Sequence, residues 1–126
     1  DVSSVADMNN MFNNSLYFNQ DISGWDVTEV TDMRQMFVSA TTFNGDISSW
    51  NVAKVTDMSS MFNTTTFNGD ISTWGVGNVT DMSYMFFNAS LFNIDISNWE
   101  VSKVTVSEEF AGGTSILAAQ FEPNFS

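Results

Sequence analysis

The chain contains no cysteine and no histidine among its 126 residues. Disulfide bonds, thiol nucleophiles, imidazole bases and the usual zinc and copper ligands are therefore excluded. No apolar run approaches the roughly 18 residues of a transmembrane helix, so direct membrane insertion is not expected. The chain has no initiator methionine and no signal peptide, and we expect it to be processed or cut from something longer.

Basic residues are also scarce. Only Arg34, Lys54 and Lys103 oppose 15 acidic residues, which gives a formal net charge of −12. Such a surface repels phosphate backbones and anionic headgroups, so nucleic acid is not an expected partner. Divalent cations and basic surfaces are better matched partners. The hydrophobic content of 43% excludes a disordered chain and predicts one folded domain with a core.

The chain does contain a repeat, marked by its four tryptophans, which lie 25, 24 and 25 residues apart. Each tryptophan ends a segment of the form Phe-Asn-x-Asp-Ile-Ser-x-Trp. A period of this length predicts stacked repeats, because one such unit cannot bury its apolar face alone. The missing residue of the 24-residue repeat falls between Phe62 and Phe67, where solenoids tolerate changes in length. The four tryptophans are Trp25, Trp50, Trp74 and Trp99.

Two periodicities alternate within each repeat. Trp25 and Val27 alternate as in a short strand, whereas Met33, Met36 and Phe37 follow the spacing of one helical face. The pattern therefore predicts a leucine-rich-repeat-like solenoid of about four to five coils. Short parallel strands would form one face and short helices the other. All eight methionines lie in such helical stretches, which favours core packing over a cofactor or copper site.

The recurring motifs Asp-Met-x-x-Met-Phe, Phe-Asn-x-Asp-Ile-Ser-x-Trp and Val-x-x-Val-Thr resemble the BspA-like leucine-rich-repeat surface proteins. The nearest subtype is the 25-residue repeat of mycoplasma, algal and protist surface proteins. The resemblance covers residues 1–110 and implies adhesion to host matrix proteins or to cells, but it defines no adhesion residues. We expect residues 111–126 to form a non-repeat cap or tail, because Val106 and Glu109 replace the two methionines of the last repeat.

An Asn-x-Asp pair recurs in every full repeat and is the candidate metal site. Stacking places equivalent carboxylates roughly 4.8 Å apart, which is unfavourable unless they accept hydrogen bonds or share a cation. Calcium is the expected ion because it prefers clustered oxygen ligands. The alternative is that each aspartate binds N–H groups of its own turn. The candidate metal ligands are Asp21, Asp46, Asp70 and Asp95.

A threonine row offers a second set of repeated polar side chains. A single flat row of threonines is compatible with ice binding, but each residue precedes an expected helix, so helix capping is favoured. The row comprises Thr31, Thr56, Thr80 and Thr105.

Five Asn-x-Ser/Thr sequences are candidate glycosylation sites and indicate a secreted glycoprotein. Asn13 and Asn63 share one repeat position just after Met-Phe, where exposure is expected. The five are Asn13, Asn63, Asn78, Asn88 and Asn124.

Taken with the resemblance, these patterns predict a non-enzymatic extracellular or cell-surface module that adheres or builds structure. The alternative is a calcium-dependent structural glycoprotein of a surface layer or filament. An enzyme such as a glycosidase is disfavoured, because repeated carboxylates do not provide one acid with a raised pKa facing another. The expected partners are a second copy stacked end to end or flanking repeats, and a cell-surface or matrix ligand.

Overall fold

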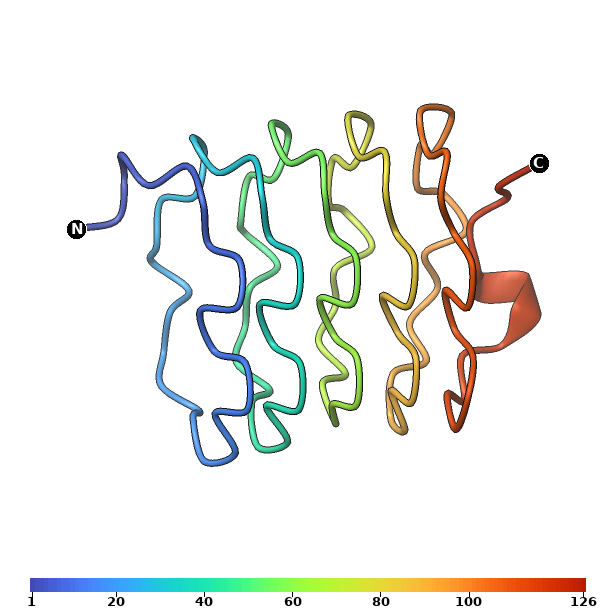
Figure 1. Ribbon diagram of the computed structural model, residues 1–126, viewed down its shortest axis with the longest axis horizontal. Helices are drawn as coiled ribbons and strands as arrows, with labels where there is room; N and C mark the ends of the chain where they lie inside the picture. The colour runs from blue at the N-terminus through green and yellow to red at the C-terminus, as the bar shows by residue number, and fades with distance from the viewer.

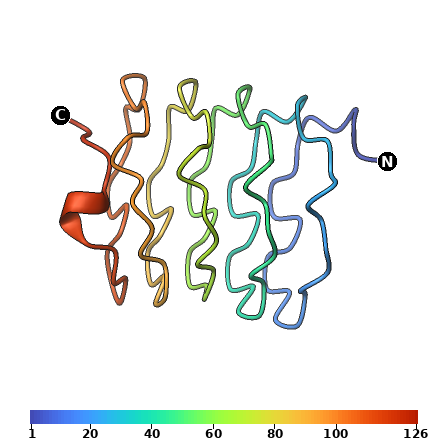
Figure 2. The same cartoon turned by 180° about the vertical axis from the view of Figure 1, so that it is seen from behind.

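A computed structural model describes residues 1–126 as a stack of five coils along one axis (Figure 1). The two termini lie at opposite ends of the stack, as the view from behind also shows (Figure 2). One position in each coil forms an isolated parallel bridge with the equivalent position of the next coil. The bridged pairs are Asp7–Asp32, Asp32–Asp57, Asp57–Asp81 and Asp81–Val106.

The predicted leucine-rich-repeat-like solenoid of parallel strands and helices is wrong. The only regular element is the 3-10 helix η1 (Ala119–Phe121), and the chain forms no α-helix and no extended strand. Each coil is instead a succession of tight turns joined to its neighbours by several rows of hydrogen bonds. With three residues, η1 is far too short to cross a membrane.

The Met-x-x-Met-Phe segments fail to form helices because a left-handed residue interrupts each of them. In the third coil Ser60 has a φ of 56°, and a helix cannot continue through that conformation. The amide of Met61 closes a turn on the carbonyl of Met58 at 3.1 Å, while the amide of Phe62 donates to Met85 of the next coil at 2.9 Å. The three- and four-residue spacing of the buried side chains therefore arises from turns.

Two positions of every coil adopt this left-handed conformation. Only one of the ten residues concerned is glycine, although non-glycine residues are strained there by about 1–2 kcal/mol each. The backbone amides of most of these residues donate hydrogen bonds to carbonyls of the next coil, and these bonds hold the residues in the left-handed conformation. The first position is occupied by Asn10, Gln35, Ser60, Tyr84 and Glu109, and the second by Asn14, Ser39, Thr64, Asn88 and Gly113.

Replacing a strained residue by glycine should stabilise the chain. Ser60→Gly is expected to raise the free energy of unfolding by about 0.5–1 kcal/mol, because the strain relieved exceeds the extra entropy of the unfolded chain. Ser60→Val should have the opposite sign, since a β-branched residue fits this conformation worst. Urea titration of both variants measures the difference. A loss of stability in Ser60→Gly would contradict the turn geometry.

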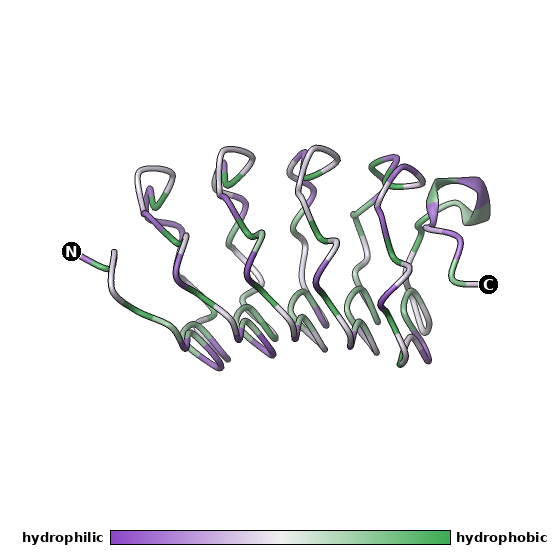
Figure 3. Cartoon of the chain, turned by 90° about the horizontal axis from the view of Figure 1, so that it is seen from above, coloured by the Kyte–Doolittle hydropathy of each residue, from purple (hydrophilic) through white to green (hydrophobic).

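The predicted strand is also a pair of turns. The amide of Trp50 bonds the carbonyl of Ile47 at 3.1 Å, and the amide of Val55 bonds that of Val52 at 3.0 Å. The inward and outward directions were nevertheless predicted correctly at this site. Trp50 and Val52 are buried, whereas Asn51 between them is exposed. Figure 3 shows how hydrophobic and hydrophilic residues alternate around each coil.

The core consists of aromatic ladders that run along the stack. Phe62 stacks on Phe37 with ring centres 5.7 Å apart and on Phe86 at 5.6 Å, with interplanar angles of 4° and 9°. A second ladder lies beside the first, and Phe67 contacts Phe62 at 4.4 Å. Seven of the eight methionines are at most 1% exposed, which confirms the core-packing interpretation. Met11 of the first coil is the exception, at 40%.

The last coil is in a different register from the one predicted. Val106 pairs with Asp81, so it replaces the aspartate of the motif, and Phe110 occupies the second methionine position. The prediction that Val106 and Glu109 replace the two methionines is therefore wrong. Residues 114–126 follow this coil and contact the end of the stack: the carbonyl of Phe121 accepts from the amide of Ile96 in the fourth coil at 3.0 Å. The ring of Phe125 meets Phe110 edge-on at 5.0 Å.

Candidate functional site

The candidate calcium ligands form a row of identical turns on the surface. In the second coil the Oδ1 atom of Asp46 accepts two hydrogen bonds from Ser48, one from the amide at 3.0 Å and one from the hydroxyl at 2.6 Å. The same pair of bonds is made by each of the other three aspartates to the serine two residues later. The carboxylate row is exposed along its length. It comprises Asp21, Asp46, Asp70 and Asp95.

These hydrogen bonds favour the ionised form of each carboxyl group. The serine hydroxyl, followed by the serine amide, lowers the pKa of all four aspartates below its ordinary value. For Asp46 the charges of Asp21 and Asp70 oppose this effect. The row therefore remains charged at neutral pH without needing a cation to stabilise it.

The lowered pKa values predict a loss of stability in acid. Just below about pH 4 the unfolded chain binds more protons than the folded chain. The stabilisation that these carboxylates provide is therefore complete above that pH. It is lost as the pH falls through the lower folded pKa. Asp70→Asn keeps a turn acceptor but cannot titrate, so its stability relative to wild type should rise between about pH 4 and pH 2. Urea titrations at several pH values measure this difference, and a constant difference would contradict the prediction.

The asparagine of each Asn-x-Asp pair joins one coil to the next. The side-chain oxygen of Asn44 accepts from the amide of Asn68 at 2.9 Å, and Asn68 accepts from the amide of Asn93 at 3.2 Å. Asn19 and Asn93 continue this row to the amides of Asn44 and Ala118. The amide oxygens thus satisfy backbone donors that turns alone would leave unpaired.

Calcium binding at the carboxylate row stays a prediction. One oxygen of each carboxylate is engaged in its turn, and no three acidic side chains of the chain gather into a group suited to a metal ion. If the row holds calcium, adding a chelator should lower the melting temperature by several degrees, through loss of a ligand of the folded state. An unchanged melting curve would rule the site out, provided metal analysis shows that calcium was bound before chelation or was added at millimolar concentration.

The threonine row has no helix to cap, and the predicted capping role is wrong. Each hydroxyl instead donates to a carbonyl of the preceding coil, as Thr56 does to Thr31 at 3.2 Å. The amide of the same threonine bonds the same carbonyl at 2.8 Å. The row therefore links coils, through Thr31, Thr56, Thr80 and Thr105.

The candidate glycosylation sites differ in accessibility. Asn78 and Asn124 are exposed, whereas Asn13, Asn63 and Asn88 are half-buried. The side-chain nitrogen of Asn78 donates to Ala53 at 2.8 Å. Asn124 is therefore the exposed sequon asparagine whose side-chain nitrogen makes no hydrogen bond within the chain.

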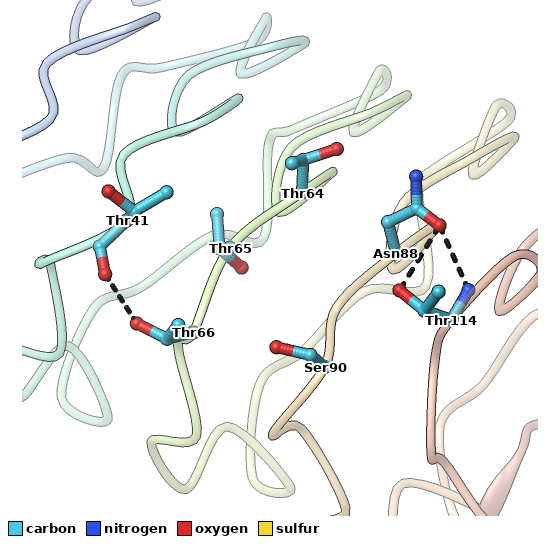
Figure 4. A pocket seen from close by; sticks show the side chains of 7 residues that line it. All are labelled: Thr41, Thr64, Thr65, Thr66, Asn88, Ser90 and Thr114. Carbon is cyan, nitrogen blue, oxygen red and sulfur yellow. Dashed lines mark hydrogen bonds between the residues drawn. The ribbon is translucent and has the colours of Figure 1, made fainter.

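A depression of about 340 Å³ lies on the surface of the shortened third coil (Figure 4). No charged or aromatic residue lines it. The deletion between Phe62 and Phe67 is visible in the sequence, but the shorter spacing alone does not indicate a binding site. The lining residues are Thr41, Thr64, Thr65, Thr66, Asn88, Ser90 and Thr114.

Comparison with protein families identifies the class to which these stacked coils belong. Residues 1–66 and 46–122 each match the family described as "Mycoplasma protein of unknown function, DUF285". The two matches together cover almost the entire chain, and the chain belongs to this family. It is the BspA-like mycoplasma surface repeat family. Neither the curated proteins nor the solved structures include a match to the chain.

Proposed function

We propose that this chain is a non-enzymatic module of an extracellular surface protein, which acts by adhesion and by stacking on further coils. Membership of a surface repeat family supports the location. The spacings of 25, 24 and 25 residues support assignment to the 25-residue repeat subtype. The lowered pKa values of the repeated aspartates make those residues unsuited to act as the acid of a glycosidase, which needs a raised pKa.

The observation that carries the proposal is the match between the two ends of the stack. Between neighbouring coils, four amides of one coil donate to four carbonyls of the next. In the first coil the four carbonyls that correspond to those acceptors receive no hydrogen bond within the chain. In the last coil the four corresponding amides donate none. The carbonyls belong to Asp7, Asn9, Met11 and Asn13, and the amides to Ser107, Glu109, Ala111 and Gly113.

Such unpaired rows are templates for pairing with another chain segment. The side-chain environment agrees, because Met11 is 40% exposed in the first coil whereas Met36 and Met61 are fully buried in the next two. A coil of the same register stacked on the first coil would bury Met11 and pair the carbonyl row, and one stacked on the last coil would pair the amide row. A second copy or flanking repeats can supply that coil. A contact between copies is head to tail and does not close on itself, so it would propagate into a filament.

Sedimentation velocity over a range of concentrations tests the proposal. Elongated oligomers that grow with concentration are expected for residues 1–126. Met11→Glu should weaken assembly, because it places a charge in the buried contact. Gln20→Glu makes the same change of charge at an exposed site of the same region and should leave assembly intact. A stable monomer of 14.0 kDa at high concentration would defeat end-to-end stacking of copies.

A further inference from the structure

The depression on the third coil has a specific structural cause. The segment after Phe62 is one residue shorter than its equivalents in neighbouring coils. In the second and fourth coils this segment contains a turn closed by the amide of a buried alanine, Ala40 or Ala89. In the third coil Thr65 takes that place, and its hydroxyl, rather than its amide, donates to Phe62 at 2.9 Å. A side-chain hydrogen bond therefore closes the shortened segment in place of a backbone turn.

Three polar groups in the depression are available to a ligand. The hydroxyls of Thr41 and Ser90 and the side-chain nitrogen of Asn88 make no hydrogen bond within the chain, although neighbouring groups do. The hydroxyl of Thr66 donates to the backbone carbonyl of Thr41 at 2.6 Å, and the side-chain oxygen of Asn88 accepts from the amide and hydroxyl of Thr114 at 2.9 and 3.2 Å. As Figure 4 shows, these residues come from successive coils and surround one space. Hydroxyls both donate and accept, and the five threonines add methyl groups.

The chemistry of the lining selects the class of ligand. It holds no cation to bind an anionic group, and the net charge of −12 repels anions. It also holds no carboxylate to pair with an ammonium group or a metal ion. Mixed donors and acceptors beside methyl groups suit a neutral ligand that carries many hydroxyls on a carbon skeleton. The volume is at the small end of ligand pockets and suits one sugar unit.

We propose that the depression binds one unit of a neutral carbohydrate. This inference deepens the proposed function, on which it rests, because it gives the adhesive surface a ligand class. Binding through few hydrogen bonds in an open depression is weak, and repetition of the module would supply avidity. Asn88 lines the depression and is itself a candidate glycosylation site. A sugar attached to it would compete with an added sugar, so the test requires protein that carries no glycan.

Saturation-transfer NMR tests the inference on unglycosylated protein produced in bacteria. The probes are glucose, galactose, mannose, N-acetylglucosamine and their short neutral oligomers, with sialylated and sulfated glycans for comparison. Transfer to at least one neutral sugar at millimolar concentration, and none to the charged glycans, is expected. Absence of transfer to every neutral sugar would overturn the inference, as would equal transfer to the charged ones.

Variants place the binding on the molecule. Ser90→Ala and Thr41→Val should each weaken binding by about 3- to 10-fold, since each removes one hydrogen bond. Ser49→Ala removes the hydroxyl of another exposed serine, outside the depression, and should have no effect on binding. Inserting one serine between Thr65 and Thr66 restores the usual length and should abolish binding, with folding checked by tryptophan fluorescence. Unchanged binding in the insertion variant would overturn the proposed location.

The same samples separate this inference from the proposed function. Sedimentation of the insertion variant should still show end-to-end assembly, because the two end coils are unaltered. Assembly without sugar binding would overturn only the carbohydrate site. Sugar binding by a protein that remains monomeric would overturn only the stacking of copies.

Discussion

Trp50→Ala is expected to lower the free energy of unfolding by about 3–5 kcal/mol. Trp50 is only 4% exposed, and its ring lies parallel to that of Trp25, with centres 6.5 Å apart and an interplanar angle of 4°. Its indole nitrogen also donates to the carbonyl of Ile22 in the preceding coil at 3.2 Å. The substitution therefore opens a cavity and removes one of the two hydrogen bonds that the carbonyl of Ile22 accepts, the other coming from the amide of Trp25. Because stability in stacked repeats depends on adjacent units, neighbouring coils should be destabilised as well.

Trp50→Phe is the matched control, since it keeps an aromatic ring but removes the indole donor. It should cost less than the alanine variant, with about 0.5–1.5 kcal/mol arising from the lost hydrogen bond to the carbonyl of Ile22. Denaturant titration followed by circular dichroism measures both variants without relying on tryptophan emission. A loss below about 1 kcal/mol for Trp50→Ala would be incompatible with the burial of this ring.

Phe62→Ala is expected to have a similarly large effect, about 3–5 kcal/mol. Phe62 is fully buried at the middle of the first aromatic ladder, where it stacks on three other phenylalanine rings, Phe37, Phe67 and Phe86. Each aromatic pair adds about 0.5–1.5 kcal/mol beyond the area that it buries. The substitution removes several pairs together and separates the two halves of the ladder.

Phe12→Ala provides the comparison at the end of the same ladder. Phe12 is half-buried and has a ladder neighbour on one side only, Phe37 at 5.5 Å. Its loss should therefore be clearly smaller than that of Phe62, as measured by urea titration of both variants. Equal losses would indicate that the ladder does not transmit stability from coil to coil.

Much of the architecture can be predicted from the sequence because the repeat is visible in it. The tryptophan spacing predicts stacked units, and the alternation at Trp50, Asn51 and Val52 predicts which side chains enter the core. The methionine spacing likewise predicts burial. Spacing alone, however, cannot distinguish a helix from successive turns, since both place residues three and four apart on one side. The left-handed conformation at Ser60 decides between them, and no glycine marks it.

The candidate sites, like the fold, could be predicted from the sequence only in part. The sequence identifies which polar residues recur, and hence that aspartate, asparagine and threonine form rows. Which atoms each side chain contacts depends on the turn that holds it. Ser48 is only two residues from Asp46, so that bond is local, and turn formation was an alternative derivable from the sequence. The partner of Thr56 lies 25 residues away, so the local context suggested a helix cap that does not exist.

The sequence by itself determined the repeat, its length, the identity of the core residues and the net charge of −12. These properties depend on residue type and period, which a chain carries whatever its conformation. Only the tertiary structure decided that the coils consist of turns, that the last coil places Phe110 at a methionine position, and that the shortened coil leaves a depression. Each depends on hydrogen bonds between residues about 25 positions apart, because those bonds hold the backbone in conformations that local preferences disfavour.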